Sequence, residues 1–312
     1  MIESMYQVQR ESHSLWVPLR GCQYHVRQWG NAATGATGAT PLVLAHGWMD
    51  VAASWQFMVD AFSEAYAAHR PIIAMDWRGY GLTEAPVTDS YWFPDYLADL
   101  DALLDALYPD QTIDLVGHSM GGNVVMMYAG SRPERIRRLV NLEGFGMPTT
   151  RPSQAPGRMS QWLNELKAQR NGDNTLKPYA DAAGVAARLM KTNRRLGQDQ
   201  AQWLAQHWAR EQADGQWHIL GDAAHKVVNP YLFHVEEALA MYSRISAPVL
   251  AVEASDDSLG QWWKGRYTLE EFHERLKSVP QLTQAFIPDA GHMLHHDQPQ
   301  ALAALIENFT TA

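Results

Sequence analysis

Hydrophobic and polar positions divide the chain into short apolar runs and longer amphipathic stretches. The runs at 41–47 ("PLVLAHG"), 71–77 ("PIIAMDW"), 112–118 ("TIDLVGH") and 135–144 ("RIRRLVNLEG") are largely apolar without alternation. Such runs are typical of strands buried on both faces of a sheet. Helical spacing is found between them at 55–67 and at 96–108. This order of strands and helices predicts an α/β fold with a mostly parallel, doubly wound sheet.

The pattern before and after this region adds further elements. Residues 13–30 predict two strands around a tight turn at Arg20 and Gly21, and the Gly/Thr/Ala-rich stretch 31–40 predicts a loop. Residues 147–235 lack a convincing buried strand and predict helices near 158–170, 180–195 and 199–213. A helix is expected after 237. Alternation resumes with a strand at 247–255, a helix at 268–279, a strand at 283–292 and a helix at 299–311. We therefore predict a core domain of residues 1–146 and 236–312, with residues 147–235 inserted as a helical cap.

Composition and charge narrow the class of protein. The chain has 312 residues, of which 46% are hydrophobic and 19% charged, as expected of a packed globular protein. Its net charge of −9 argues against sequence-independent binding of nucleic acid. The single cysteine, Cys22, excludes an intramolecular disulfide and is expected to be a small buried hydrophobe. No run of 18 apolar residues and no signal-peptide pattern is found, so we expect a cytoplasmic protein without a membrane span.

The segment "TIDLVGHSMGGNVVMMYA" places Ser119 between an apolar strand and an apolar helix. A Gly-x-Ser-x-Gly pattern in this position is the nucleophile elbow, in which a sharp turn exposes the serine hydroxyl above the sheet. The free amides at the start of the helix, including that of Met120, then face the reacting carbonyl oxygen. We predict that Ser119 is a nucleophile.

A serine nucleophile needs a base, and His292 is the best placed of the 13 histidines. It follows the last predicted strand in "IPDAGHMLHHDQP", so it should lie on the same sheet edge as Ser119. The neighbouring His295, His296 and Asp297 resemble a metal cluster, but we expect a solvated segment at a helix start with Asp297 as a possible N-cap. His118 is expected to point away from the serine and to pack.

Together these motifs resemble those of the α/β-hydrolase-fold enzymes. The matching pieces are "LVLAHGW" (42–48), "AMDWRGYGLTE" (74–84), "LVGHSMGG" (115–122), "APVLAVEASDD" (247–257) and "DAGHML" (289–294). The resemblance implies that the backbone amides of Trp48 and Met120 form an oxyanion hole. It also implies that Asp76, Arg78, Gly79 and Gly81 are architectural residues. The dehalogenases and epoxide hydrolases of this fold carry an aspartate at the elbow, so Ser119 disfavours their chemistry.

The resemblance leaves the acid of the catalytic triad open between three residues. The family order of nucleophile, acid and histidine selects Asp257, although Ala254 replaces the glycine usual in this motif. Glu143 ends the preceding strand, from which some haloalkane-dehalogenase-like members take their acid. Asp256 is the third candidate. Any of the three could orient His292, and Asp257 is the first choice.

The predicted cap carries aromatic and methionine side chains that suit an apolar or aromatic substrate, although most should serve packing. They are Met159, Trp162, Tyr179, Met190, Trp203, Trp208, Trp217, Tyr231 and Phe233. Lys191, Arg194 and Arg195 form a basic cluster that we expect to be a solvated helix end. His46, Gly47, Trp48 and Trp55 lie in or beside the predicted oxyanion loop and are candidates for the pocket.

These features predict a serine hydrolase that cleaves a small or medium carboxylic ester through an acyl-enzyme, without a metal or organic cofactor. Hydrolases of carbon–carbon bonds in aromatic ring-cleavage products, thioesterases and lactonases share the framework and are alternative interpretations. A hydrolase-like ligand receptor is the alternative that is not an enzyme. The expected partner is a small-molecule substrate, and the sequence does not indicate an oligomeric state.

Overall fold

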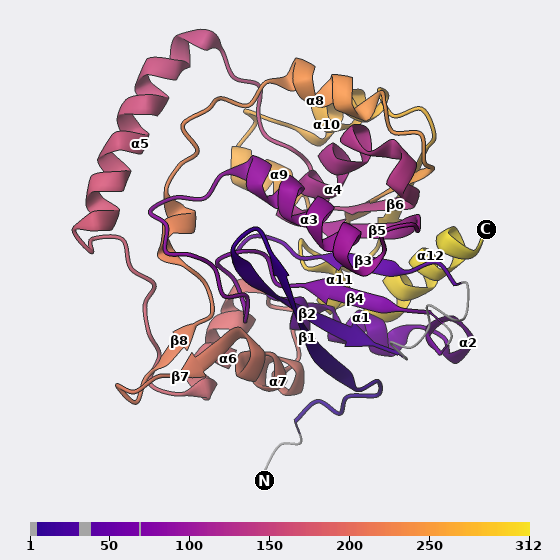
Figure 1. Cartoon of the computed structure of the whole chain (residues 1–312), viewed down its shortest axis with the longest axis horizontal. Coiled ribbons are helices and arrows are strands. Elements are labelled where there is room, and N and C mark those ends of the chain that lie inside the picture. Colours follow the sequence, from indigo (N-terminus) through magenta and orange to yellow (C-terminus); the bar gives the residue numbers. More distant parts are fainter. Residues whose placement is uncertain (1–4, 31–38, 69) are drawn as a thin grey trace.

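A computed structural model describes residues 5–30, 39–68 and 70–312 of the chain. Its centre is an eight-stranded sheet in the order β1-β2-β4-β3-β5-β6-β9-β10 (Figure 1). Only β1–β2 and β2–β4 pair antiparallel, and the other neighbours are parallel. The strands are β1 (Ser12–Leu19), β2 (Cys22–Trp29), β3 (Leu42–Ala45), β4 (Ile72–Met75), β5 (Ile113–His118), β6 (Ile136–Leu142), β9 (Val249–Ala254) and β10 (Leu282–Ile287). The predicted mostly parallel α/β sheet is confirmed.

The N-terminal hairpin turns at Arg20 and Gly21, as predicted. Both residues have positive φ, which suits a tight connection between antiparallel strands. Residues 31–38 of the predicted loop lie outside the described residues.

Helices cover both faces of the sheet, and each face has its own apolar core (Figure 1). One face packs against α3, α4, α8 and α10, and the other against η2, α1, α2, α11 and α12. The helices are η2 (Ala52–Trp55), α1 (Gln56–Ala61), α2 (Glu64–Ala67), α3 (Phe93–Leu107), α4 (Met120–Ser131), η3 (Pro133–Arg135), α8 (Val235–Tyr242), α9 (Ser258–Trp263), α10 (Leu269–Leu276), α11 (Leu294–Asp297) and α12 (Pro299–Thr311).

The single helix predicted at 55–67 is broken in the structure. After α1, Phe62 adopts an extended conformation, and the Ser63 side chain caps α2 by accepting a hydrogen bond from the Tyr66 amide at 3.2 Å. A serine favours this capping role, which apolar periodicity does not detect.

The segment 147–235 contributes no strand to the large sheet. It contains η4 (Pro152–Gln154), α5 (Ala155–Arg170), α6 (Ala182–Thr192), α7 (Gln198–Trp208), the strands β7 (Ala209–Glu211) and β8 (Trp217–Ile219), and η5 (Ala223–Lys226). The predicted helix 199–213 ends at Trp208, because the chain there enters a hairpin that turns at Asp214 and Gly215, whose φ is 74°. That residues 147–235 form a separate cap domain stays a prediction.

The two parts of this segment pack differently. Helices α6 and α7 share a buried cluster with Val51, Ala53 and Phe57 of the core region. In α5 only Leu166 is buried, and Figure 1 shows this helix at the left margin, apart from the sheet. None of the helices in the described part of the chain is long and apolar enough to cross a membrane.

Candidate active site

Ser119 lies on a sharp turn between β5 and α4. Its backbone has φ 55° and ψ −115°, a strained conformation for a residue with a side chain. A Cβ at Gly117 would collide with the backbone of Gly121, and one at Gly121 would collide with the carbonyl of Ala45. The glycines therefore let the strand, the turn and the helix approach closely enough to hold Ser119 above the sheet edge.

His292 approaches the serine from the loop between β10 and α11. Its Nε2 lies 2.8 Å from Ser119 Oγ, within hydrogen-bond distance. The backbone of His292 is also held, because His118 Nε2 lies 2.7 Å from its carbonyl oxygen and donates to it. His118, which we expected only to pack, thus ties the main chain of His292 to the end of β5.

Glu143 supplies a carboxylate to the other side of the His292 ring. Its Oε2 lies 3.2 Å from His292 Nδ1, while its Oε1 accepts a hydrogen bond from the Ala254 amide at 2.8 Å. Glu143 follows β6, the strand next to β5, and is buried. His292 therefore lies between the Ser119 hydroxyl and the Glu143 carboxylate.

The first-choice acid, Asp257, is not brought to His292. Its carboxylate accepts a hydrogen bond from the Gly260 amide at 2.7 Å and caps the start of α9, in an exposed position. Asp256 instead pairs with Arg195 at 2.7 Å. Spacing favoured Asp257, but β9 lies one strand further from β5 than β6 does, and the Asp257 side chain satisfies the helix start instead.

Burial changes the pKa values of the two titratable groups at the site. It lowers the pKa of His292, so the imidazole is neutral and can accept a proton. It raises the pKa of the Glu143 carboxyl, an effect that hydrogen bonds from the Ala254 amide and the Ser258 side chain oppose. General-base catalysis requires the form in which His292 is neutral and Glu143 is ionised.

The loop 46–48 passes directly beside Ser119. A Cβ built on Gly47 would lie 3.1 Å from Ser119 Cβ and 3.0 Å from His118 Nδ1. The Trp48 amide, which follows Gly47, has no backbone hydrogen-bond partner among the described residues, and Met120 is the first residue of α4. The amides at helix starts lack partners within the helix. Both amides predicted for the oxyanion hole thus belong to segments that adjoin Ser119.

The residues predicted for the pocket fall into different environments. Trp48 is 52% exposed, whereas Trp55 is fully buried and packs 4.8 Å from the ring of His295. Trp55 therefore cannot line an open pocket in this structure. His46 is also buried, and its ring bonds to the Gly47 carbonyl and the Trp77 amide, so it supports the loop rather than a substrate.

Sequence reasoning missed Trp262 on α9. Its side chain is 47% exposed, and its ring meets that of His292 edge to face at 4.4 Å. Phe145 lies behind it at 6.4 Å. An exposed tryptophan in contact with His292 is a candidate wall for an apolar group of a substrate. In the sequence only the tryptophan pair at 262–263 pointed to Trp262, and a tryptophan pair is equally compatible with packing in the core.

Most aromatic side chains of the segment 147–235 hold it in place. Trp203 packs against Phe57 and Tyr6, and Trp208 Nε1 donates to the Met49 carbonyl at 3.1 Å. Trp217, Tyr179 and Met190 pack against the same cluster as Trp203. Arg195, expected in a solvated helix end, pairs with Asp256 and with Asp289 of the core.

Met159 and Tyr231 are exposed, and Trp162 is partly exposed. Phe233 lies below the guanidinium of Arg275 at 5.9 Å.

The loop after β4 has the architectural contacts that the resemblance implies. Asp76 bonds to His25 Nδ1 at 2.7 Å and to the Leu82 amide at 2.9 Å. Arg78 makes two bonds to the buried Asp99, at 2.5 and 2.6 Å. These buried contacts fix the loop that follows β4. Neither Asp76 nor Arg78 forms one of these bonds with Ser119.

The expectation of a solvated His-His-Asp segment was wrong for its two histidines. His295 and His296 are both buried in α11, and the Asp297 carboxylate accepts hydrogen bonds from the Gly291 amide and from Asn193. The predicted final helix begins at Pro299 as α12, with Gln298 rather than Asp297 at its N-cap, and the two histidines lie in a separate short helix, α11. The His295 ring packs against those of His118 and Trp55, and the His296 ring packs against that of Phe57.

Comparison with known proteins shows the family of the chain. Residues 40–299 match the model of the alpha/beta hydrolase fold family, and the chain belongs to that family. A zebrafish (Danio rerio) serine hydrolase-like protein is 26% identical over 280 residues, covering 88% of this chain and 82% of that protein. A 2-hydroxy-6-oxo-2,4-heptadienoate hydrolase of Pseudomonas putida is 36% identical over 110 residues, covering 34% of this chain and 38% of that one. Among solved structures, a thioesterase domain from the curacin biosynthetic pathway superposes with a TM-score of 0.78 at 24% identity, covering 95% and 99% of the two chains.

Proposed function

We propose that this hydrolase is a serine esterase that cleaves a small or medium carboxylic ester with an apolar or aromatic portion. The observation that carries the proposal is the position of His292, with Nε2 at 2.8 Å from Ser119 Oγ and Nδ1 at 3.2 Å from Glu143 Oε2. A hydroxyl, an imidazole and a carboxylate in this order define the serine triad by geometry rather than by sequence position.

In the proposed reaction His292 removes the proton of Ser119 as Oγ attacks the ester carbonyl carbon. The Trp48 and Met120 amides would stabilise the resulting oxyanion. His292 then gives its proton to the alkoxide as the bond between the carbonyl carbon and the alkoxy oxygen breaks, leaving an acyl-serine. A water molecule, deprotonated by His292, attacks the acyl group and releases the acid and the serine hydroxyl. Glu143 holds the ring in the required tautomer and stabilises the imidazolium.

The exposed indoles of Trp48 and Trp262 support an apolar substrate portion. Trp48 belongs to the proposed oxyanion loop, and the Trp262 ring packs against that of His292, so each offers exposed apolar surface on a segment that contributes to the proposed site. Aromatic side chains provide large contact areas for a substrate group while keeping a polar edge toward water.

Active-site labelling tests the proposal. A fluorophosphonate probe should label the wild-type chain on Ser119 and should fail to label a Ser119→Ala variant that is folded. A panel of p-nitrophenyl esters should be hydrolysed by the wild type, with kcat at least about 10⁴-fold lower in Ser119→Ala. A folded wild type that neither labels nor turns over would contradict the proposal and would favour a ligand receptor with the hydrolase shape.

A second candidate function is cleavage of a carbon–carbon bond in a product of aromatic ring opening. The local match to the Pseudomonas hydrolase favours it, because that relative is named for such a substrate. The assay panel should therefore include a vinylogous diketone and a thioester. A kcat/KM for the diketone above that for every ester would replace the ester proposal with this one.

A further inference from the structure

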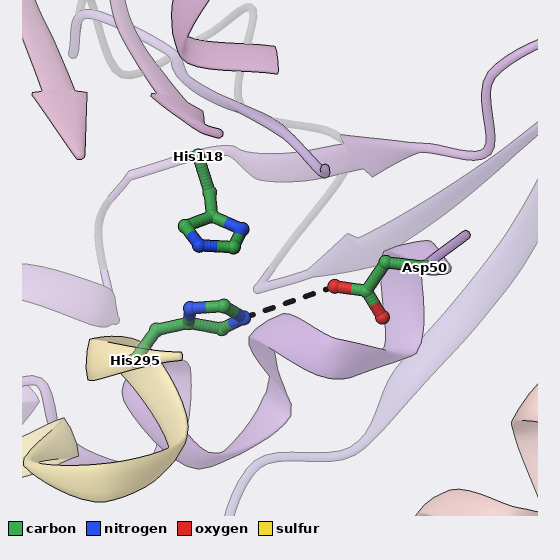
Figure 2. A group of neighbouring side chains, drawn as sticks. All are labelled: Asp50, His118 and His295. Atoms are coloured by element: carbon green, nitrogen blue, oxygen red, sulfur yellow. Dashed lines mark ion pairs between the residues drawn. The ribbon is translucent and has the colours of Figure 1, made fainter. Parts of the chain in front are cut away.

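Three buried side chains converge beside His292, where the His118 ring lies 4.7 Å from the His292 ring. Asp50 follows the loop 46–48, His118 ends β5 and His295 lies in α11. They are 5%, 2% and 0% exposed, and one ligand atom from each lies within 4.8 Å of the other two. Figure 2 shows the His118 and His295 rings one above the other, with the Asp50 carboxylate beside them.

The contacts of each side chain leave a lone pair directed into this cluster. Because His118 Nε2 donates to the His292 carbonyl, its Nδ1 carries the lone pair, and no described residue donates to it. Asp50 Oδ1 accepts a hydrogen bond from the Ser54 hydroxyl, whereas Oδ2 has no hydrogen-bond partner in the described part of the chain. His295 Nε2 points toward Oδ2 at 3.9 Å, and neither of its nitrogens is bonded to a described residue.

Such unpaired groups are costly in a protein interior, about 1–3 kcal/mol each. Burial raises the pKa of Asp50 to about 7 and lowers those of His118 and His295 well below the ordinary value, so both imidazoles are neutral. The titratable groups that face them are His46, His292, His296 and Asp76. With neutral histidines, the cluster holds no cation of its own to compensate Asp50.

We propose that Asp50, His118 and His295 form a buried site for a divalent transition-metal ion of the Zn²⁺ class. Two neutral imidazoles and one carboxylate are a donor set that such ions prefer. The bond from His118 Nε2 to a backbone carbonyl, and that from Ser54 to Asp50, are the outer contacts that orient metal ligands. This proposal departs from the sequence-based expectation that no metal binds.

The ligand atoms would have to move together on binding. Ligands of a tetrahedral zinc ion with bonds of about 2.0–2.1 Å lie roughly 3.3–3.5 Å apart, which is shorter than the 3.9 Å between His295 and Asp50. Because His118 also holds the main chain of His292, occupancy of the site would stiffen the support of the base. The ion would not contact the substrate, and the proposal does not depend on the proposed esterase activity.

Cobalt binding tests the site. Since the cluster is closed to solvent, the full chain is unfolded with a chelator and refolded with Co²⁺, which reports its coordination by visible absorption. We expect one equivalent of Co²⁺ with the intense bands of a four- or five-coordinate site. The affinity should fall at least about tenfold in Asp50→Asn and in His295→Gln. The matched control is His218→Gln, because His218 also faces a carboxylate, that of Asp214 at 2.9 Å, but on the surface.

Thermal unfolding gives a second measurement. Zn²⁺ should raise the Tm of the wild type and of His218→Gln, since an ion that binds only the folded state stabilises it, and it should leave Asp50→Asn unchanged. Equal Co²⁺ affinity in the wild type and His295→Gln, or loss of binding in His218→Gln, would overturn the proposal. If a cluster variant does not fold, the wild type decides alone: no bound Co²⁺, or only the weak spectrum of an octahedral aqua-like ion, rejects the site.

Discussion

Glu143 and His292 are 149 positions apart in the chain, yet the Glu143 carboxylate lies 3.2 Å from the His292 ring and is held in place by the Ala254 amide. Replacing Glu143 by Gln keeps the side-chain shape but removes the charge that fixes the tautomer of His292. We expect kcat for an ester substrate to fall by about 10³–10⁴-fold. Steady-state kinetics on the folded variant measures this loss.

Asp257→Asn is the matched comparison. It should keep kcat within a few-fold of the wild type, and its altered cap on α9 should change stability by no more than about 1 kcal/mol. If Asp257→Asn lost activity while Glu143→Gln kept it, the assignment of the acid would be reversed.

The pH dependence of activity should report the titration of Glu143 and His292. The competent form has an ionised Glu143 and a neutral His292, so kcat/KM should rise with pH as the pair loses its shared proton. Burial lowers the pKa of His292 and raises that of Glu143. In Glu143→Gln only the histidine remains, without a neighbouring negative charge to favour its protonated form. The acid limb of the residual activity should therefore move to lower pH. A limb that stays in place or moves to higher pH would contradict this interpretation.

The loop beside the nucleophile should not tolerate a larger residue at position 47. In Gly47→Ala the new methyl group would lie 3.1 Å from Ser119 Cβ and 3.0 Å from His118 Nδ1, so the loop must move away. We expect kcat to fall at least about tenfold and stability to fall by about 1–3 kcal/mol. Ester kinetics and urea unfolding measure the two effects.

Gly157→Ala is the control for this substitution. Gly157 lies in α5, and nothing lies within 4 Å of a Cβ at that position. Alanine should leave activity unchanged there and stabilise the helix by about 0.5–1 kcal/mol. Equal effects of the two substitutions would show that the Gly47 contact is unimportant.

The buried charge cluster of the Arg78 loop should matter for stability. Asp99 is fully buried and accepts hydrogen bonds from Arg78, Arg20 and Tyr24. Asp99→Ala leaves the Arg78 charge without its buried partner and should cost about 3–5 kcal/mol in the free energy of unfolding. Urea denaturation followed by circular dichroism measures this cost.

The exposed pair of Asp89 and Arg170, at 3.0 Å, provides the comparison for Asp99. Its loss in Asp89→Ala should cost about 0–1 kcal/mol, because water screens the two charges. A cost for Asp99→Ala no larger than that for Asp89→Ala would show that the buried cluster is not a stabilising unit.

The sheet and the positions of Ser119 and His292 could be predicted because apolar runs mark buried strands, and parallel strands bring their ends to one edge. The choice between Glu143 and Asp257 could not. Both follow strands, and spacing does not reveal that β6 neighbours β5, or that Asp257 turns to the start of α9. The same limit applies to Trp55 and His295, whose burial depends on how η2 and α11 pack together. Periodicity also predicted α5, but it did not indicate that Leu166 is the only buried residue of this helix.

The bond between His118 and the His292 carbonyl has a consequence for how the site is maintained. It joins the residue that precedes Ser119, the proposed nucleophile, to the backbone of His292, the proposed base. Ser119 and His292 are therefore brought together by main-chain geometry and not only by side-chain rotamers. The order needed for proton transfer is then established when the chain folds. The binding energy of a substrate is then not needed to align Ser119 with His292, and more of that energy is available to lower the reaction barrier.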